Sequence, residues 1–188
     1  MNVVLASASP RRRELLALLV KDFTCEPTHI DETERPGESP ESYVHRLARE
    51  KAAASPQSDA LVIAADTTVA IQNTILGKPA DRADAERILL SLSGRSHEVH
   101  TAIAVRFGAR VESRLVSTLV TFAAISRSLL NQYLMTEEPW DKAGAYGIQG
   151  LAGSFVTRID GSYSAVVGLP LAETRELLSG FGLTPQWV

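Results

Sequence analysis

The stretch LASASPRRREL, residues 5–15, joins a short apolar run to a predicted helix. Ser9 and Pro10 have the character of a helix N-cap and a first helical residue, because a serine oxygen can accept a free backbone N–H and proline fixes φ without losing a hydrogen bond. We therefore expect a helix that begins near Pro10, directly after a strand and a tight turn. This order of strand, turn and helix is typical of phosphate-binding sites.

Three arginines, Arg11, Arg12 and Arg13, crowd the first turn of this predicted helix. A helix N-terminus carries a partial positive charge, so each arginine opposes the helix dipole by roughly 0.3 to 1 kcal/mol if no anion compensates. Free backbone N–H groups and planar guanidinium groups both suit phosphate oxygens. The cluster therefore predicts a bound phosphate, and a solvated charged face is the alternative.

The composition is that of a globular protein, with 188 residues, 45% of them hydrophobic and 22% charged, and a formal net charge of −3. We expect one domain that spans residues 1–188. The slightly acidic balance argues against nucleic acid or a membrane as a partner and favours a small anionic ligand at the arginines. Cys25 is the only cysteine, which excludes an internal disulfide and a cysteine-built metal site and indicates a reducing, cytoplasmic location.

Helical and extended patterns alternate along most of the chain. Beyond the first helix, the pattern predicts helices at residues 40–54, 81–92, 126–136 and 170–180. It predicts extended segments at residues 23–30, 60–66, 67–72, 98–108, 114–125 and 153–159, with those at 98–108 and 114–125 forming an antiparallel pair. This alternation indicates an α/β fold in which a mixed central β-sheet is flanked by helices. Ligands bind such folds in crevices at strand ends.

Carboxylates stand at two of the polar positions between these elements. Asp66 ends the apolar segment at residues 60–66, directly before two threonines. There it could hold a divalent cation or accept a proton from water, and a structural aspartate that binds loop N–H groups is the alternative. Asp31 and Glu32 lie in a polar loop, where acids are usually only solvated.

Two lysines and one glutamine complete the candidate groups. Lys78 lies in the short bend ILGKP, residues 75–79, which can aim an ammonium group, and Lys51 lies late in the helix predicted at 40–54. Gln149 lies in the Gly-rich segment AGAYGIQG, residues 143–150, and its amide can offer a donor and an acceptor to the edge of a base. Ordinary surface lysines and a plain connecting loop are the alternatives.

Cations and carboxylates together are what hydrolysis of a nucleoside triphosphate requires, since cations neutralise the phosphates and carboxylates bind a metal or activate water. The sequence has no GxxxxGK[ST] signature, which argues against a P-loop NTPase. The four histidines lack a metal-binding spacing.

Seven ordered segments point further, namely LASASPRRREL (5–15), IDET (30–33), RLAREKA (46–52), AADTTV (64–69), LGKP (76–79), KAGAYGIQG (142–150) and GSYSAVVGLPL (161–171). They resemble the motifs of the Maf family of nucleotide pyrophosphatases, over most of the chain. The resemblance implies a Maf/inosine-triphosphate-pyrophosphatase-like fold with two lobes around a cleft, often as a homodimer. It implies hydrolysis of a nucleoside triphosphate to the monophosphate and pyrophosphate with a divalent cation, Mg²⁺ or Mn²⁺. The last two segments look like those of the family's dTTP/UTP branch.

The resemblance also implies roles for individual residues. The residues that match substrate-binding positions are Ser7, Arg11, Arg12, Lys51, Thr67 and Gln149. The residues that match catalytic positions are Asp66, Glu32 and Lys78. Glu32 and Asp66 also match metal-binding positions, and which of the two is the general base stays open.

Two other classes of function remain as alternatives. One is a nucleotide-binding regulator of cell division with little catalysis, because the family has been linked to septum formation; the presence of both Asp66 and Glu32 favours an enzyme. The other is a protein that binds RNA or DNA through the arginines, against which the acidic balance counts.

Overall fold

A computed structural model describes residues 1–185 and 187, and it contains a seven-stranded mixed sheet. The strand order is β2-β1-β3-β5-β6-β7, with β4 paired to β3. β1 is parallel to β2 and to β3, and the other pairs are antiparallel. The strands are β1 (Val3–Leu5), β2 (Thr24–Cys25), β3 (Leu61–Ile71), β4 (Thr74–Leu76), β5 (Ser96–Phe107), β6 (Arg110–Phe122) and β7 (Val156–Asp160).

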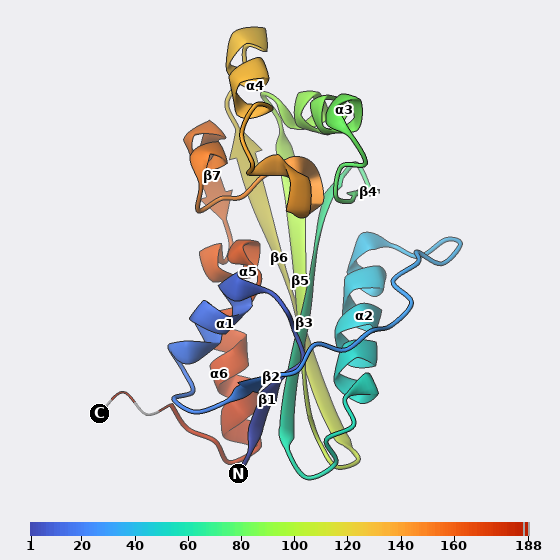
Figure 1. Cartoon of the computed structure of the whole chain (residues 1–188), viewed down its shortest axis with the longest axis vertical. Helices are drawn as coiled ribbons and strands as arrows, with labels where there is room; N and C mark the ends of the chain where they lie inside the picture. The colour runs from blue at the N-terminus through green and yellow to red at the C-terminus, as the bar shows by residue number, and fades with distance from the viewer. Residues whose placement is uncertain (186, 188) are drawn as a thin grey trace.

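Helices cover both faces of this sheet. The α-helices are α1 (Pro10–Ala17), α2 (Pro40–Ala54), α3 (Arg82–Leu92), α4 (Arg127–Tyr133), α5 (Tyr163–Val167) and α6 (Leu171–Gly180), and short 3₁₀ helices are η1 (Pro139–Asp141), η2 (Ala143–Ala145) and η3 (Leu151–Phe155). Figure 1 shows α2 beside one face of the long strands and α1 and α6 beside the other, whereas α3 and α4 lie at the end where β5 begins and β6 ends. Within the described residues, no helix combines the length and the apolar character that crossing a bilayer requires.

The apolar core divides in the same way. Leu16 and Leu177 lie in a cluster between the sheet and α1 with α6. Ala48 and Ala64 lie in a cluster between the sheet and α2, where small side chains let the helix approach the strands closely. Phe122 belongs to a third cluster, which joins α3, α4 and the 3₁₀ helices. Polar segments converge between these clusters, and this is where the site lies.

Several helix ends confirm the predictions from the sequence. The side chain of Ser9 accepts a hydrogen bond from the backbone N–H of Arg12, and Pro10 is the first residue of α1. Helix α2 spans residues 40–54 as expected, with Ser39 as its N-cap. Gly94, which follows α3, has a φ of 68°, a left-handed conformation that glycine adopts readily.

The prediction of two strands at residues 60–66 and 67–72 is wrong, because β3 runs unbroken from Leu61 to Ile71. Asp66 therefore lies in the middle of a strand rather than at its end. Backbone pairing with β5 continues through Asp66 and Thr67, and Lys51 donates a hydrogen bond to the Asp66 carboxylate. Because the Asp66 carboxylate has Lys51 as its partner, Asp66 and Thr67 do not interrupt the strand.

Other boundaries also differ from the predictions. Only Thr24 and Cys25 of the extended segment at 23–30 pair as a strand. The strand expected at 153–159 begins at Val156, because η3 precedes it. Helix α5 was not predicted: the side chain of Ser162 caps it by accepting from the N–H of Ala165, and its five residues are too few to show a periodic pattern.

Candidate active site

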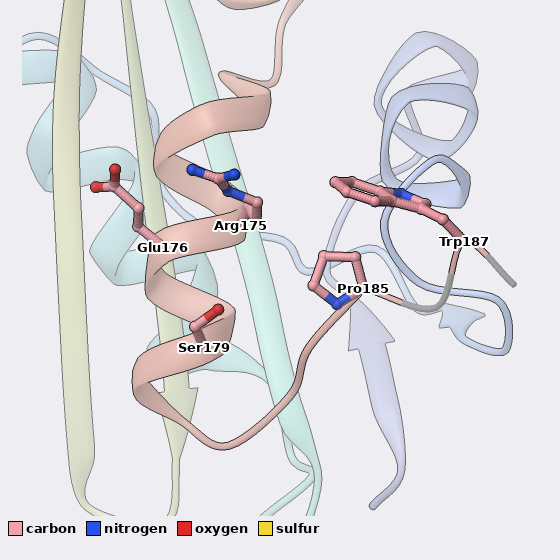
Figure 2. Close-up of a pocket in the computed structure, with 5 residues that line it drawn as sticks. All are labelled: Arg175, Glu176, Ser179, Pro185 and Trp187. Atoms are coloured by element: carbon pink, nitrogen blue, oxygen red, sulfur yellow. The ribbon is translucent and has the colours of Figure 1, made fainter.

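The nine site residues predicted from the sequence come from distant parts of the chain and line one cleft of about 990 Å³. They are Ser7, Arg11, Arg12, Glu32, Lys51, Asp66, Thr67, Lys78 and Gln149. A second pocket, of about 440 Å³, lies beside α6 and contains none of them (Figure 2); its lining is Arg175, Glu176, Ser179, Pro185 and Trp187. The large cleft is therefore the candidate active site, while the roles of the individual residues stay predictions.

The cleft lies where one edge of β3 has no partner strand. β5 pairs along the opposite edge. On the cleft edge, β1 ends opposite Ile63 and β4 ends opposite Val69, so no described strand flanks residues 64–68 there. Successive side chains of a strand point to opposite faces of the sheet. At this unpaired edge Asp66 and Thr67, which belong to opposite faces, both border the cleft.

Arg12 joins three elements at the floor of the cleft. Its Nε donates to the backbone oxygen of Gly168 at 2.9 Å, Nη2 donates to Thr67 Oγ1 at 3.2 Å, and Nη1 donates to Ser7 Oγ at 3.4 Å. Burial lowers the pKa of Arg12, and the nearby Asp66 carboxylate opposes that shift. A guanidinium keeps its charge even so, so the cleft contains a fixed cation.

Groups of the protein itself supply part of the negative charge expected beside the arginine cluster, and the first is the backbone oxygen of Gly168. Gly168 is the C-cap of α5, and carbonyl groups at a helix C-terminus lack intrahelical partners and carry partial negative charge. Arg12 thus binds the C-terminal end of one helix from the N-terminal end of another. Arg11 lies 4.0 Å from the carboxylate of Asp141, whereas Arg13 is exposed.

Lys51 connects the two candidate carboxylates. Its Nζ lies 2.7 Å from Asp66 Oδ1 and 3.0 Å from Glu32 Oε1. The side chains of Lys51 and Asp66 are only 11% and 10% exposed, whereas that of Glu32 is 55% exposed. Because removing one member of a buried ion pair leaves an uncompensated charge, Lys51 fixes the Asp66 carboxylate in place beside the cleft.

Asp66 and Glu32 could hold a divalent cation only if the phosphates of a bound substrate and water supplied further oxygen ligands. Nowhere in residues 1–185 and 187 do three or more His, Cys, Asp or Glu side chains form a group that could hold a metal ion. Mg²⁺, however, is commonly held by one or two carboxylates together with substrate phosphates and water. Since Asp66 and Glu32 already converge on one cationic group, the Lys51 ammonium, the pair has suitable chemistry for such a cation.

The loop that carries Glu32 is fixed from α2. Tyr43 donates its hydroxyl to the backbone oxygen of Glu32 at 2.9 Å. Arg46 donates to the backbone oxygen of Thr33 at 3.1 Å and to Glu38 Oε1 at 2.6 Å. Burial, followed by the charges of Asp66 and Glu32, raises the pKa of Tyr43 to about 12, so its hydroxyl remains a donor at neutral pH.

We call the residues around the unpaired edge, Ser7, Arg12, Lys51, Asp66 and Thr67, the strand side of the cleft. The segment at 138–150, which we call the loop side, supplies further lining residues. Its Gln149 is exposed and borders the cleft. Its Tyr146 is buried, and the hydroxyl forms a 2.8 Å hydrogen bond with His97 Nε2.

Lys78 also lines the cleft. It is exposed on the bend after β4, and the backbone oxygen of the preceding Gly77 accepts from the N–H of Gly144 at 3.1 Å. A Cβ at Gly144 would lie 3.0 Å from the Val69 side chain, so the loop side packs tightly on the end of β3. This contact joins the bend that carries Lys78 to the loop side.

A cleft with fixed cations, paired carboxylates and an exposed amide suits a nucleotide with several phosphates. Residues 2–181 match the family described as "Maf-like protein". The chain belongs to the Maf family. Maf-family relatives named dTTP/UTP pyrophosphatase include one from Shewanella oneidensis, 54% identical over 97% of this chain and 100% of that protein, and one from Myxococcus xanthus, 52% identical over 98% of this chain and 95% of that protein.

Among solved structures, a HAM1 protein from Coxiella burnetii is similar to this Maf-family chain over 65% of its length and 73% of the other chain, with 21% identity and a TM-score of 0.46. A Ham1 protein from Staphylococcus aureus is similar over 67% of this chain and 72% of the other, with 16% identity and a TM-score of 0.46.

Sequence reasoning missed several residues of this Maf-family site. It did not find Tyr43 and Arg46, whose bonds fix the Glu32 loop. It also missed Glu138, which lines the loop side. Their polar side chains look like ordinary surface residues in the sequence, because only the fold brings them to the segments that they bind.

Proposed function

We propose that this chain is a nucleoside triphosphate pyrophosphatase that hydrolyses dTTP and UTP to the monophosphate and pyrophosphate. Similarity over nearly the full length to proteins with that name supports the activity. The observation that carries the proposal is the position of Lys51 between Asp66 and Glu32, in the same cleft as Arg12. This arrangement supplies both a base for water and cations for a leaving group.

The cations bind the triphosphate in this proposal. Arg12, Arg11 and the hydroxyl of Ser7 contact phosphate oxygens at the start of α1, and Lys51 and Lys78 contact them from the other walls of the cleft. Guanidinium groups give paired, directed hydrogen bonds to phosphate, and ammonium groups act as point charges. The bound anion also offsets the repulsion between the arginines and the dipole of α1.

Hydrolysis then proceeds by attack of water on the α-phosphorus. Asp66 Oδ2 accepts one proton of that water as the oxygen bonds to phosphorus, while Oδ1 keeps its hydrogen bond from Lys51. The bond between the α-phosphorus and the bridging oxygen breaks, and pyrophosphate leaves with the electron pair of that bond. Arg12 and Lys78 stabilise the charge that develops on the leaving group.

Glu32 and Asp66 would hold the divalent cation, Mg²⁺ or Mn²⁺, together with phosphate oxygens. When bound, this cation neutralises phosphate charge.

Recognition of the base is assigned to Gln149, because one amide can pair with the carbonyl and N–H edge that thymine and uracil share, and cytosine presents a different edge. Thr67 contributes to substrate binding by accepting a hydrogen bond from Arg12, which holds the guanidinium in the cleft.

A panel of standard and modified nucleoside triphosphates tests the proposal. We expect dTTP and UTP to be turned over in preference to CTP, with the monophosphate and pyrophosphate as products in equal amounts. Release of inorganic phosphate without pyrophosphate would show a different reaction. Binding of nucleotides without turnover in the presence of Mg²⁺ or Mn²⁺ would instead support a nucleotide-binding regulator.

A further inference from the structure

Glu138, on the loop side, binds the start of the 3₁₀ helix η3 that follows the loop side. Its Oε2 accepts from the backbone N–H of Leu151 at 2.6 Å, and its Oε1 accepts from the N–H of Ala152 at 3.0 Å. These N–H groups belong to the first residues of η3, whose N-cap, Gly150, has no side chain to cap them. Free N–H groups at a helix start favour a carboxylate, so Glu138 caps η3 from another part of the chain.

Two further contacts fix Glu138, one at its carboxylate and one at its backbone oxygen. The hydroxyl of Tyr133, on α4, donates to Glu138 Oε1 at 3.1 Å. Burial and the Glu138 charge raise the pKa of Tyr133, so this hydroxyl stays protonated and remains a donor. Lys142 Nζ donates to the backbone oxygen of Glu138 at 2.9 Å. The position of Glu138 is therefore set by the core, through Tyr133, and by its own turn, through Lys142.

The glycines beside Gln149 pack directly on these groups. A Cβ at Gly150 would lie 2.2 Å from Glu138 Oε2, and a Cβ at Gly147 would lie 2.9 Å from Lys142 Cε. The backbone on both sides of Gln149 thus rests on Glu138 and Lys142. No side chain other than hydrogen would fit at these two places without displacing the groups beneath.

We propose that Glu138 is a positioning residue for base recognition: it holds the loop at 147–150 so that the Gln149 amide meets the pyrimidine edge in a fixed orientation. This inference rests on the proposed function, which assigns base recognition to Gln149. Glu138 acts through the loop backbone, and the strand side, with Arg12 and Asp66, does the chemistry.

Glu138→Gln tests the proposal, because the amide keeps the size of the carboxylate but replaces one acceptor with an NH₂ group that faces an N–H donor. We expect KM for dTTP and UTP to rise about tenfold and the preference over CTP to fall by a similar factor, the usual effect of losing one hydrogen bond of about 1.4 kcal/mol. We expect kcat to stay within about threefold, and inhibition by inorganic tripolyphosphate, which has no base, to be unchanged.

Glu137→Gln is the matched control, since Glu137 is exposed and does not line the cleft; it should leave all four quantities unchanged. Gly150→Ala is the second variant. Gly150 has a φ of −105°, which any residue adopts, so the added methyl chiefly displaces the Glu138 carboxylate. It should reproduce the rise in KM and the loss of base preference with Glu138 intact, even if Glu138→Gln is poorly folded.

An unchanged preference for dTTP over CTP in a folded Glu138→Gln or in Gly150→Ala would overturn the proposal. So would an equal loss of tripolyphosphate inhibition and of kcat, because that would indicate general damage to the cleft. A wild-type protein without base preference or pyrophosphate release would be a failure of the proposed function, which is visible before any variant is compared.

Discussion

The two sides of the cleft are built differently. The strand side is fixed by regular structure: Asp66 and Thr67 lie within β3, Lys51 in α2 and Arg12 in α1. The loop side is an irregular segment fixed by individual side chains, of which Glu138 is the most connected. Groups on regular elements are held more precisely than groups on loops.

The difference separates two tasks in the proposed mechanism. Chemistry at phosphorus is the same for every nucleotide, and it is assigned to groups whose positions depend on the fold as a whole. Choice of base is assigned to Gln149, an exposed side chain on the loop side. Variants on the strand side should therefore lower turnover, and variants on the loop side should alter selectivity.

The largest effect is expected from Asp66→Asn, on the strand side. The amide keeps the size of the carboxylate but cannot accept the proton of water, so kcat should fall by about 10² to 10⁴. Binding of dTTP, measured by calorimetry, should persist because Arg12 and Lys51 remain. Asp59→Asn, at an exposed position, is the control. Near-normal turnover would remove Asp66 from the mechanism and move the base role to Glu32.

The next effect compares two arginines on one helical turn. Arg12→Ala should lower kcat/KM about 100-fold, the effect of losing charge-assisted hydrogen bonds worth about 1.5 to 3 kcal/mol. It should also lower Tm, because the three bonds to Gly168, Thr67 and Ser7 are lost. Arg13→Ala, at an exposed position, should change kcat/KM less than about twofold. Equal losses in the two variants would mean that the arginines act only through overall charge.

A pH effect on stability is expected from His97, which bonds to Tyr146 on the loop side. Burial lowers the pKa of His97 to about 4, so the unfolded chain takes up its proton at higher pH than the folded protein does. Stability is therefore complete above pH 6.5 and is lost as the pH falls towards 4, by about 2 kcal/mol between pH 7 and pH 5.

Urea unfolding at both pH values measures this loss. The variant His97→Gln should flatten the pH dependence by about that amount, whatever its absolute stability. The control is His29→Gln, at an exposed histidine, which should keep the wild-type slope. If His97→Gln keeps that slope too, another group is responsible for the pH dependence.

The smallest effect is expected from Gln149→Ala, on the loop side. The preference for dTTP and UTP over CTP should fall about tenfold, since one recognition hydrogen bond of about 1.4 kcal/mol is removed. The value of kcat should change little, because this side chain does not touch the reacting atoms. Product assays with the three nucleotides measure both quantities, with Gln132→Ala, on the exposed face of α4, as the control. A collapse of kcat would place Gln149 in the chemistry and erase the distinction between the two sides.

Much of the fold could be predicted from the sequence because its signals are local. Ser9 with Pro10 marked the start of α1, and Gly94 marked the end of α3. The unbroken course of β3 could not be predicted in this way. Asp66 lowers the local strand signal, and only the partner on α2, Lys51, which is distant in sequence, makes it acceptable there.

The candidate site likewise has a part that could be predicted from the sequence and a part that could not. Its members were proposed from residue type and from the family resemblance, and the structure places all nine around one cleft. The supporting contacts of Arg46 and Glu138 were not predictable, because each binds backbone groups that the sequence gives no reason to bring near. Apart from proline, which lacks the N–H, every residue carries the same backbone acceptor and donor, so these groups leave no mark in the sequence.

The unpaired edge of β3 also bears on aggregation through strand pairing. A free strand edge is a template on which strands of other molecules can pair, and proteins usually cover it. On this edge β1 and β4 occupy both ends and leave only residues 64–68 between them. An incoming strand of more than about five residues, the common strand length, would collide with one of the two. The protein can therefore offer bare backbone to a small ligand without creating a site for aggregation.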